Sequence, residues 1–178
     1  MRGCGRGKRG DHWGDPAVRL LTRLQQRSLQ IAKRHVGERE ATGRNDGAAV
    51  RFWQRLVAKG YSWLDNQPWC VCFATGVVYL AGKELGVTPE LPLNASSSSL
   101  YAWAKRQGKL LPQPVDGCIG VVRAPVGGSA EGRSHTHTFL VHTVHPNGVL
   151  ASVEGNFRNA VGWNQRRVPY GCDWVEIG

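Results

Sequence analysis

The sequence predicts an α+β domain, because amphipathic helical segments come first and a period-two alternation of apolar residues follows them. The chain has 178 residues, which is enough for one domain with a substantial core. Its hydrophobic content of 41% and charged content of 20% are typical of globular proteins. We therefore expect a basic Arg/Gly-rich tail over residues 1–14 and a single folded domain over residues 15–178.

Capping residues and glycines mark the expected helix boundaries. Asp15 followed by Pro16 is typical of an N-cap and a first helical position, and Gly86 follows the last apolar residue of the third segment. A Pro- and Ser-rich loop at 88–99 separates the third segment from the fourth. The expected helices span about residues 16–36, 48–59, 70–85 and 99–107.

The second part of the chain reads as an antiparallel sheet. Asn147-Gly148 is a strong hairpin signal between two apolar runs. If these two residues form the loop, Val141 lies opposite Glu154. The expected strands span about residues 117–123, 137–145, 149–154 and 166–175.

Cys70 is the candidate nucleophile of this chain. It begins the apolar segment 70–85, where free backbone N–H groups and the positive end of the helix dipole favour a thiolate. The same N–H groups are placed to hold the oxyanion of a tetrahedral intermediate. Because the dipole contributes only about 0.3–1 kcal/mol, a neighbouring histidine has to supply most of the activation.

His137, Glu154 and Asn156 are the candidate partners of Cys70. Side chains alternate between the two faces of a strand, so all three project from one face of the predicted hairpin. His137 would take the thiol proton, while a polar group on its other ring nitrogen would orient the imidazole. His135 shares this face by the same parity and remains a rival for the base.

The remaining cysteines and histidines predict neither a metal nor a cofactor. Five cysteines is an odd number, without the spacing of a disulfide framework, and we expect Cys72, Cys118 and Cys172 to be buried and inert. Four histidines gather near the predicted hairpin, but their spacing is not that of a standard zinc site. These histidines are His135, His137, His142 and His145.

A net charge of +10 favours an anionic partner, which charge alone leaves open among nucleic acid, a membrane surface and a cell-wall polymer. The basic N-terminus lacks the apolar core of a secretory signal, and no stretch approaches the about 20 apolar residues of a membrane span. We expect synthesis in the cytoplasm with reduced thiols. Trp63, Trp103 and Trp163 are candidates for lining a sugar- or peptide-binding groove, and the sequence does not choose among them.

Four short motifs occur in a fixed order: residues 31–40, the PWCVCF box at 68–73, the HTFLV strand at 137–141 and the VEGN segment at 153–156. Together they resemble the CHAP family of peptidoglycan hydrolases, within the papain-like NlpC/P60 superfamily, over about residues 28–175. The resemblance implies an α+β papain-like fold whose N-terminal helices, the nucleophile helix among them, pack on an antiparallel sheet.

The resemblance also implies roles for single residues. It implies Cys70 as nucleophile rather than Cys72, and His137 as base rather than His135. Glu154 and Asn156 would orient or polarise the imidazole. Some relatives bind calcium in an acidic loop before the cysteine, but only Asp65 and Asn66 stand there in this chain, so no metal is expected.

The expected function is hydrolysis of an amide bond in bacterial peptidoglycan, by an N-acetylmuramoyl-L-alanine amidase or a peptide endopeptidase. The leading interpretation is a phage lysin or virion-associated lysin, monomeric outside a virion, that acts in the periplasm or cell wall after lysis or injection. The alternatives are a secretion-system toxin that degrades the wall, an inactive structural virion relative and a basic nucleic-acid-binding protein. Nucleic acid is not the expected partner, because that alternative leaves the ordered Cys–His–Glu-x-Asn pattern unexplained.

Overall fold

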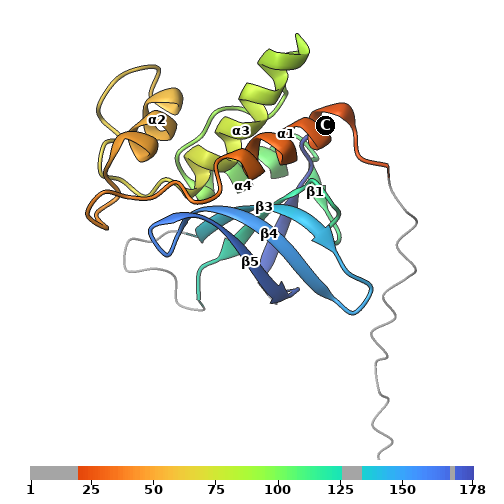
Figure 1. The fold of residues 1–178 in the computed structure, drawn as a ribbon. Coiled ribbons are helices and arrows are strands. Elements are labelled where there is room, and N and C mark those ends of the chain that lie inside the picture. The colour runs from red at the N-terminus through yellow and green to blue at the C-terminus, as the bar shows by residue number, and fades with distance from the viewer. Residues whose placement is uncertain (1–19, 126–133, 169–170) are drawn as a thin grey trace, which may run out of the picture.

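The computed structural model describes residues 20–125, 134–168 and 171–178, which form four helices packed on a six-stranded antiparallel sheet (Figure 1). The predicted α+β class is confirmed. The helices are α1 (Arg23–Arg34), α2 (Ala48–Val57), α3 (Cys70–Leu85) and α4 (Ser97–Arg106). The strands are β1 (Leu110–Leu111), β2 (Ile119–Arg123), β3 (His135–Val144), β4 (Val149–Phe157), β5 (Ala160–Arg167) and β6 (Cys172–Val175).

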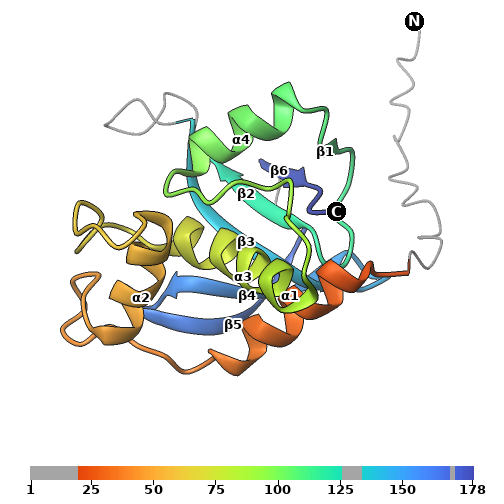
Figure 2. The same cartoon turned by 90° about the horizontal axis from the view of Figure 1, so that it is seen from above.

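The strand order across the sheet is β1-β6-β2-β3-β4-β5. Each neighbouring pair is antiparallel, and β3 and β4 occupy interior positions. Seen from above, α3 crosses β3 and β4 between α4 and α1 (Figure 2). The helix that begins at Cys70 therefore packs on the two strands that carry its candidate partners.

Helix α3 is the element that the sequence predicts best. It runs from Cys70 to Leu85 as expected, and Gly86 ends it in the left-handed C-cap conformation with a φ of +67°. Its residues 70–78 are all buried, because α1, α2 and the sheet all pack against this helix. A helix that is apolar all round is stabilised by this kind of enclosure.

Two predicted helix starts are wrong. Helix α1 begins only at Arg23, because the Thr22 side chain accepts from the N–H of Gln25 and the Gln25 side chain accepts from the N–H of Thr22. Residues 20–22 are not helical, and the expected Asp15-Pro16 cap, like the basic tail 1–14, lies outside the described residues. Helix α4 begins two residues early, at Ser97, because the Ser96 hydroxyl caps it.

The single strand expected over residues 166–175 is wrong as well. The chain forms two strands there, Ala160–Arg167 and Cys172–Val175, separated by Gly171 at a φ of +91°. These strands lie far apart in the sheet, with β5 at one edge beyond β4 and β6 between β1 and β2.

The predicted two-residue hairpin loop is also wrong. The His145 N–H donates to the Val149 carbonyl at 2.7 Å, so the loop between β3 and β4 has three residues. A bulge at His142 then shifts the register again, and Val141 pairs with Ser152 instead of Glu154. The longer loop and the bulge each shift the register by one residue, so together they shift it by two. The alternation of faces on the far side of the bulge therefore stays as predicted.

The core has two parts, one on each face of the sheet. The larger part joins the helices to one face and includes Trp53, Phe73 and Leu140. The smaller part, on the other face, consists of residues from strands and loops. Its buried members are Cys118, Phe139, Val141, Leu150, Cys172 and Trp174. Among the described residues, no helix is both long and apolar enough to cross a membrane.

Candidate active site

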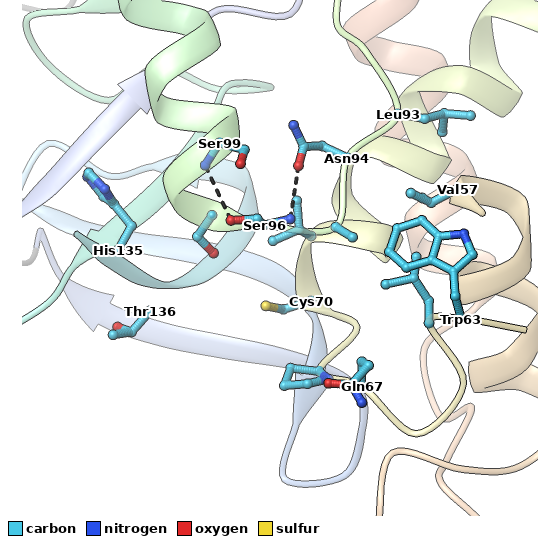
Figure 3. A pocket seen from close by; sticks show the side chains of 15 residues that line it. Val57, Trp63, Gln67, Cys70, Leu93, Asn94, Ser96, Ser99, His135 and Thr136 are labelled. Carbon is cyan, nitrogen blue, oxygen red and sulfur yellow. Dashed lines mark hydrogen bonds between the residues drawn. The ribbon is translucent and has the colours of Figure 1, made fainter. Parts of the chain in front are cut away.

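Cys70 is the first residue of α3, and its side chain lines a cleft (Figure 3). Trp69 is the N-cap, but no side chain caps this end of the helix. The first N–H groups of a helix lack intrahelical acceptors, and without a side-chain cap those at the start of α3 can donate to an oxyanion. This part of the expectation for Cys70 agrees with the geometry.

The segment that leads into Cys70 is fixed by hydrogen bonds from elsewhere in the chain. The Trp69 indole N–H donates to Glu40 Oε1 at 3.0 Å, and the other oxygen of Glu40 accepts from the N–H of Asn45 at 2.8 Å. The Gln54 side chain donates to the carbonyl of Gln67 at 2.7 Å. The position of the nucleophile thus depends on buried polar side chains that the sequence did not single out.

Gly155 lets the start of α3 lie directly against β4. A Cβ built at this position would lie 2.5 Å from the Cβ of Phe73 and 3.0 Å from the Trp69 ring. Any larger residue would push the helix away from the strand. The glycine in the VEGN segment therefore sets the approach of the nucleophile helix to the strand that carries Glu154.

His137 joins Cys70 to Glu154. Its Nε2 lies 2.8 Å from Glu154 Oε2, and Cys70 is a second hydrogen-bonding partner of the ring. Burial disfavours the charged imidazolium, but the hydrogen bonds to Cys70 and Glu154, together with the charge of the Glu154 carboxylate, outweigh this effect. These contacts raise the pKa of His137 from 6.5 to about 9. A histidine held this way is suited to exchange a proton with the thiol.

Glu154 is fully buried and is held by three partners. Besides His137, the Ser152 hydroxyl donates to its Oε1 at 2.5 Å, and the Arg166 guanidinium forms an ion pair with the same oxygen. Burial alone would raise its pKa, yet the hydrogen bonds from His137 and Ser152 and the charge of Arg166 lower it below the usual 4.5. The carboxylate is therefore charged and turned towards the imidazole.

Ser152 and Arg166 are functional candidates that the sequence reasoning missed. Ser152 carried a signal, since it precedes Glu154 by two residues and so shares its face of β4. Arg166 lies on β5, opposite Leu150 in the register. The strand expected over 166–175 begins at Arg166, but no local pattern indicated that this residue pairs with β4.

Asn156 has no hydrogen bond to His137 among the described residues. Its φ is +57°, at the irregularity where the pairing of β4 with β5 shifts between Glu154 and Phe157. No hydrogen bond of the Asn156 side chain is found within the described parts of the chain. The predicted role of Asn156 as a polar partner of the imidazole stays a prediction, whereas Glu154 makes the contact.

The prediction that His135 shares the face of His137 is wrong. Strand β2 pairs Val122 with His137 but Arg123 with His135, so Thr136 is an extra residue and the alternation flips. His135 contacts the Tyr101 ring of α4, and its Nε2 lies 2.9 Å from Asp173. Its Nδ1 lies 2.9 Å from the Ser134 hydroxyl. Neither partner of its ring is Cys70, so His137 and not His135 is the imidazole beside the thiol.

The other cysteines lie away from this chemistry, as expected. Burial raises the pKa of Cys72 to about 12 and that of Cys172 to about 11, so both are thiols at neutral pH. Cys118 is fully buried in the smaller core. Cys4 lies outside the described residues.

The histidines near the hairpin have separate surroundings. His142 Nδ1 lies 2.7 Å from the Thr143 hydroxyl, and its ring meets Trp163 edge-on.

Upstream of the nucleophile, Asp65 is held by the Arg55 guanidinium, at 2.7 Å to its Oδ2. No group of three or more metal-ligating side chains is found in the described ranges.

No protein-family model, curated protein or solved structure matches this chain. The chemistry of the site follows from Cys70, His137 and Glu154 themselves. A thiol, a half-buried imidazole and a charged carboxylate in series can activate a nucleophile and shuttle one proton.

Proposed function

We propose that this protein is a cysteine hydrolase that cleaves an amide bond of bacterial peptidoglycan. The observation that carries the proposal is the series Cys70–His137–Glu154, in which His137 Nε2 is 2.8 Å from the carboxylate and Cys70 is the second hydrogen-bonding partner of the ring. The CHAP-like order of motifs adds the substrate class, and with it the expectation of a papain-like NlpC/P60 fold.

The proposed reaction begins with transfer of the Cys70 proton to His137. The thiolate attacks the amide carbonyl, and the tetrahedral oxyanion accepts hydrogen bonds from the uncapped N–H groups at the start of α3. His137 then protonates the leaving amine, and the C–N bond breaks to leave a thioester on Cys70. Water, deprotonated by His137, hydrolyses the thioester and restores the thiol.

Glu154 serves this cycle by holding the imidazole and by stabilising its charged form. It stays ionised because Arg166 and Ser152 compensate for its burial. Arg166 and Ser152 are in this proposal positioning residues, since they act on the reaction only through Glu154.

The net charge of +10 supports a wall substrate, because peptidoglycan and its attached polymers are anionic. A phage lysin or a virion-associated lysin is the proposed setting, acting in the periplasm or cell wall. The alternative setting is a secretion-system toxin with the same chemistry. A lysin and a toxin of this kind differ in how they are delivered and not in the bond that they cut.

Digestion of purified sacculi tests the proposal. We expect the wild-type chain to release soluble fragments, and Cys70→Ala to release none. Cys72→Ala is the matched control, since Cys72 lies two residues further along the same helix and is fully buried. Mass spectrometry of the fragments identifies the bond.

Equal release by wild type and Cys70→Ala would overturn the nucleophile assignment. No release by a folded wild-type chain would favour an inactive structural relative. Retention of DNA at physiological salt without any digestion would favour a nucleic-acid-binding protein instead.

A further inference from the structure

The cleft around Cys70 carries almost no charge. It has a volume of about 690 Å³, within the range of small-ligand sites. Among the described residues that line it, none is Asp, Glu, Lys or Arg, although the chain has 23 basic and 13 acidic residues. His135 is the one histidine of this lining, and Asp173 and Ser134 occupy its ring nitrogens. A cleft so uncharged in so basic a chain selects for a neutral ligand.

One side of the cleft offers an aromatic platform. Trp63 is 65% exposed and lies across the cleft from His135 and Thr136, with Cys70 between them (Figure 3). The other candidate tryptophans lie elsewhere, since Trp103 packs against the main core and Trp163 meets His142 on the sheet. The structure thus selects Trp63 from the three tryptophans that the sequence left open.

The same cleft offers neutral hydrogen-bonding groups. Asn94 Oδ1 accepts from the Ser96 N–H at 2.9 Å, which fixes the amide and leaves its NH2 group without a protein partner in the described chain. The exposed side chain of Ser99 adds a hydroxyl at the start of α4 (Figure 3). An indole face beside amide and hydroxyl donors suits a ligand with a broad apolar face and many hydroxyl or acetamido groups.

We infer that this cleft binds an N-acetylhexosamine of the glycan strand on the Trp63 side, so that the bond cut is the amide between the glycan's lactyl group and the first stem residue. This inference rests on the proposed function and narrows it to amidase over endopeptidase. The sugar ring stacks on Trp63, and its acetamido or hydroxyl oxygens accept hydrogen bonds from Asn94 and Ser99.

The chemistry of the competing bonds supports this choice. The lactyl–alanine amide has neutral groups on both sides. Most stem-peptide bonds adjoin a carboxylate or an ammonium group. A neutral cleft would bury that charge without a group of opposite charge beside it, which costs free energy. A D-alanyl-glycine cross-bridge is also neutral, but neither residue presents a ring-sized face to the indole of Trp63.

Two defined substrates test the inference. One is the disaccharide with its attached stem peptide, and the other is the cross-linked stem peptide freed of glycan. We expect Cys70-dependent cleavage of the first only. Trp63→Ala should lower kcat/KM for it roughly tenfold. The matched control Trp163→Ala, at a residue 44% exposed on β5, should change it less than about twofold.

A binding arm separates this inference from the proposed function. An N-acetylglucosamine tetramer is titrated into Cys70→Ala and into the same chain carrying Trp63→Ala or Asn94→Asp in addition. Asn94→Asp keeps the oxygen that accepts from Ser96 but removes the free NH2 donor. We expect binding to Cys70→Ala that either second substitution weakens roughly tenfold, with circular dichroism confirming the fold.

The outcomes are distinct. Cleavage of the glycan-free peptide at an equal rate overturns the inference and leaves the proposed function standing. If the folded wild type cleaves neither substrate, the proposed function fails, and tetramer binding that depends on Trp63 still supports the sugar site. Absence of tetramer binding, or equal binding by the Trp63→Ala chain, overturns the inference.

Discussion

Replacing Glu154 with Gln tests how the site sets the protonation of His137. The pKa of His137 rises from 6.5 to about 9, a preference for imidazolium of about 3 kcal/mol at 1.36 kcal/mol per pKa unit. Glutamine removes the carboxylate charge beside the ring and leaves the Arg166 charge uncompensated nearby. Both effects disfavour imidazolium, so we expect the pKa of His137 to fall by about 1–2 units.

The same substitution changes how stability depends on pH. Because the folded-state pKa of His137 is raised, its contribution is complete below pH 6.5 and is lost as the pH rises through about 9. Glu154 has a lowered pKa, so its contribution is present above pH 4.5 and is lost as the pH falls below that value. Between pH 6.5 and 9, the free energy of unfolding of Glu154→Gln should therefore fall less steeply than that of the wild type.

Nuclear magnetic resonance titration of the His137 ring measures the pKa, and chemical denaturation across this pH range measures the stability. Asp173→Asn is the matched control, because Asp173 also lies between a histidine, His135, and an arginine, Arg123. We expect it to leave the pKa of His137 unchanged. An unchanged pKa in Glu154→Gln, or an equal fall in Asp173→Asn, would refute the reasoning.

Three further predictions concern the support of the nucleophile. Gly155→Ala should destabilise the fold by about 1–3 kcal/mol, since its Cβ would meet that of Phe73 at 2.5 Å. Gly162→Ala, whose nearest contact would be 3.1 Å, should cost less in the same thermal unfolding assay. Glu40→Ala should destabilise by about 1–3 kcal/mol by leaving two N–H donors unpaired, and Glu40→Gln should recover part of this in denaturant titrations. Iodoacetamide at neutral pH should label Cys70 but not Cys72, whose pKa burial raises to about 12, and peptide mapping that finds Cys72 modified first would contradict the assignment.

The sequence predicted those parts of the fold that depend on local signals. Helix α3 followed from a continuous apolar segment and Gly86, and both ends agree with the structure. The start of α1 does not agree with the prediction from Asp15-Pro16, because Thr22 and Gln25 form a capping box that begins the helix at Arg23. Most of strand β5 was missed because it lies at the edge of the sheet, where Val161 is its one buried residue and gives no apolar alternation.

The site was predicted in part for a similar reason. The shared face of His137 and Glu154 survived because a longer loop and the bulge at His142 are two odd steps that cancel in parity. Sequence patterns do not locate bulges, so agreement on the face depended on that cancellation. Arg166 depends on strand pairing between distant segments, which no local pattern encodes.

The choice between His135 and His137 follows from one extra residue in β3. Had the alternation continued through Thr136, both rings would point to the same face and compete for the thiol. The bulge instead gives each ring its own carboxylate and arginine, with Asp173 and Arg123 on the helix-covered face and Glu154 and Arg166 on the other. Deleting this irregularity would bring His135 to the face of His137 and its partners. The bulge is thus what reserves Glu154 for a single imidazole, and it explains how two similar histidines two residues apart acquire different surroundings.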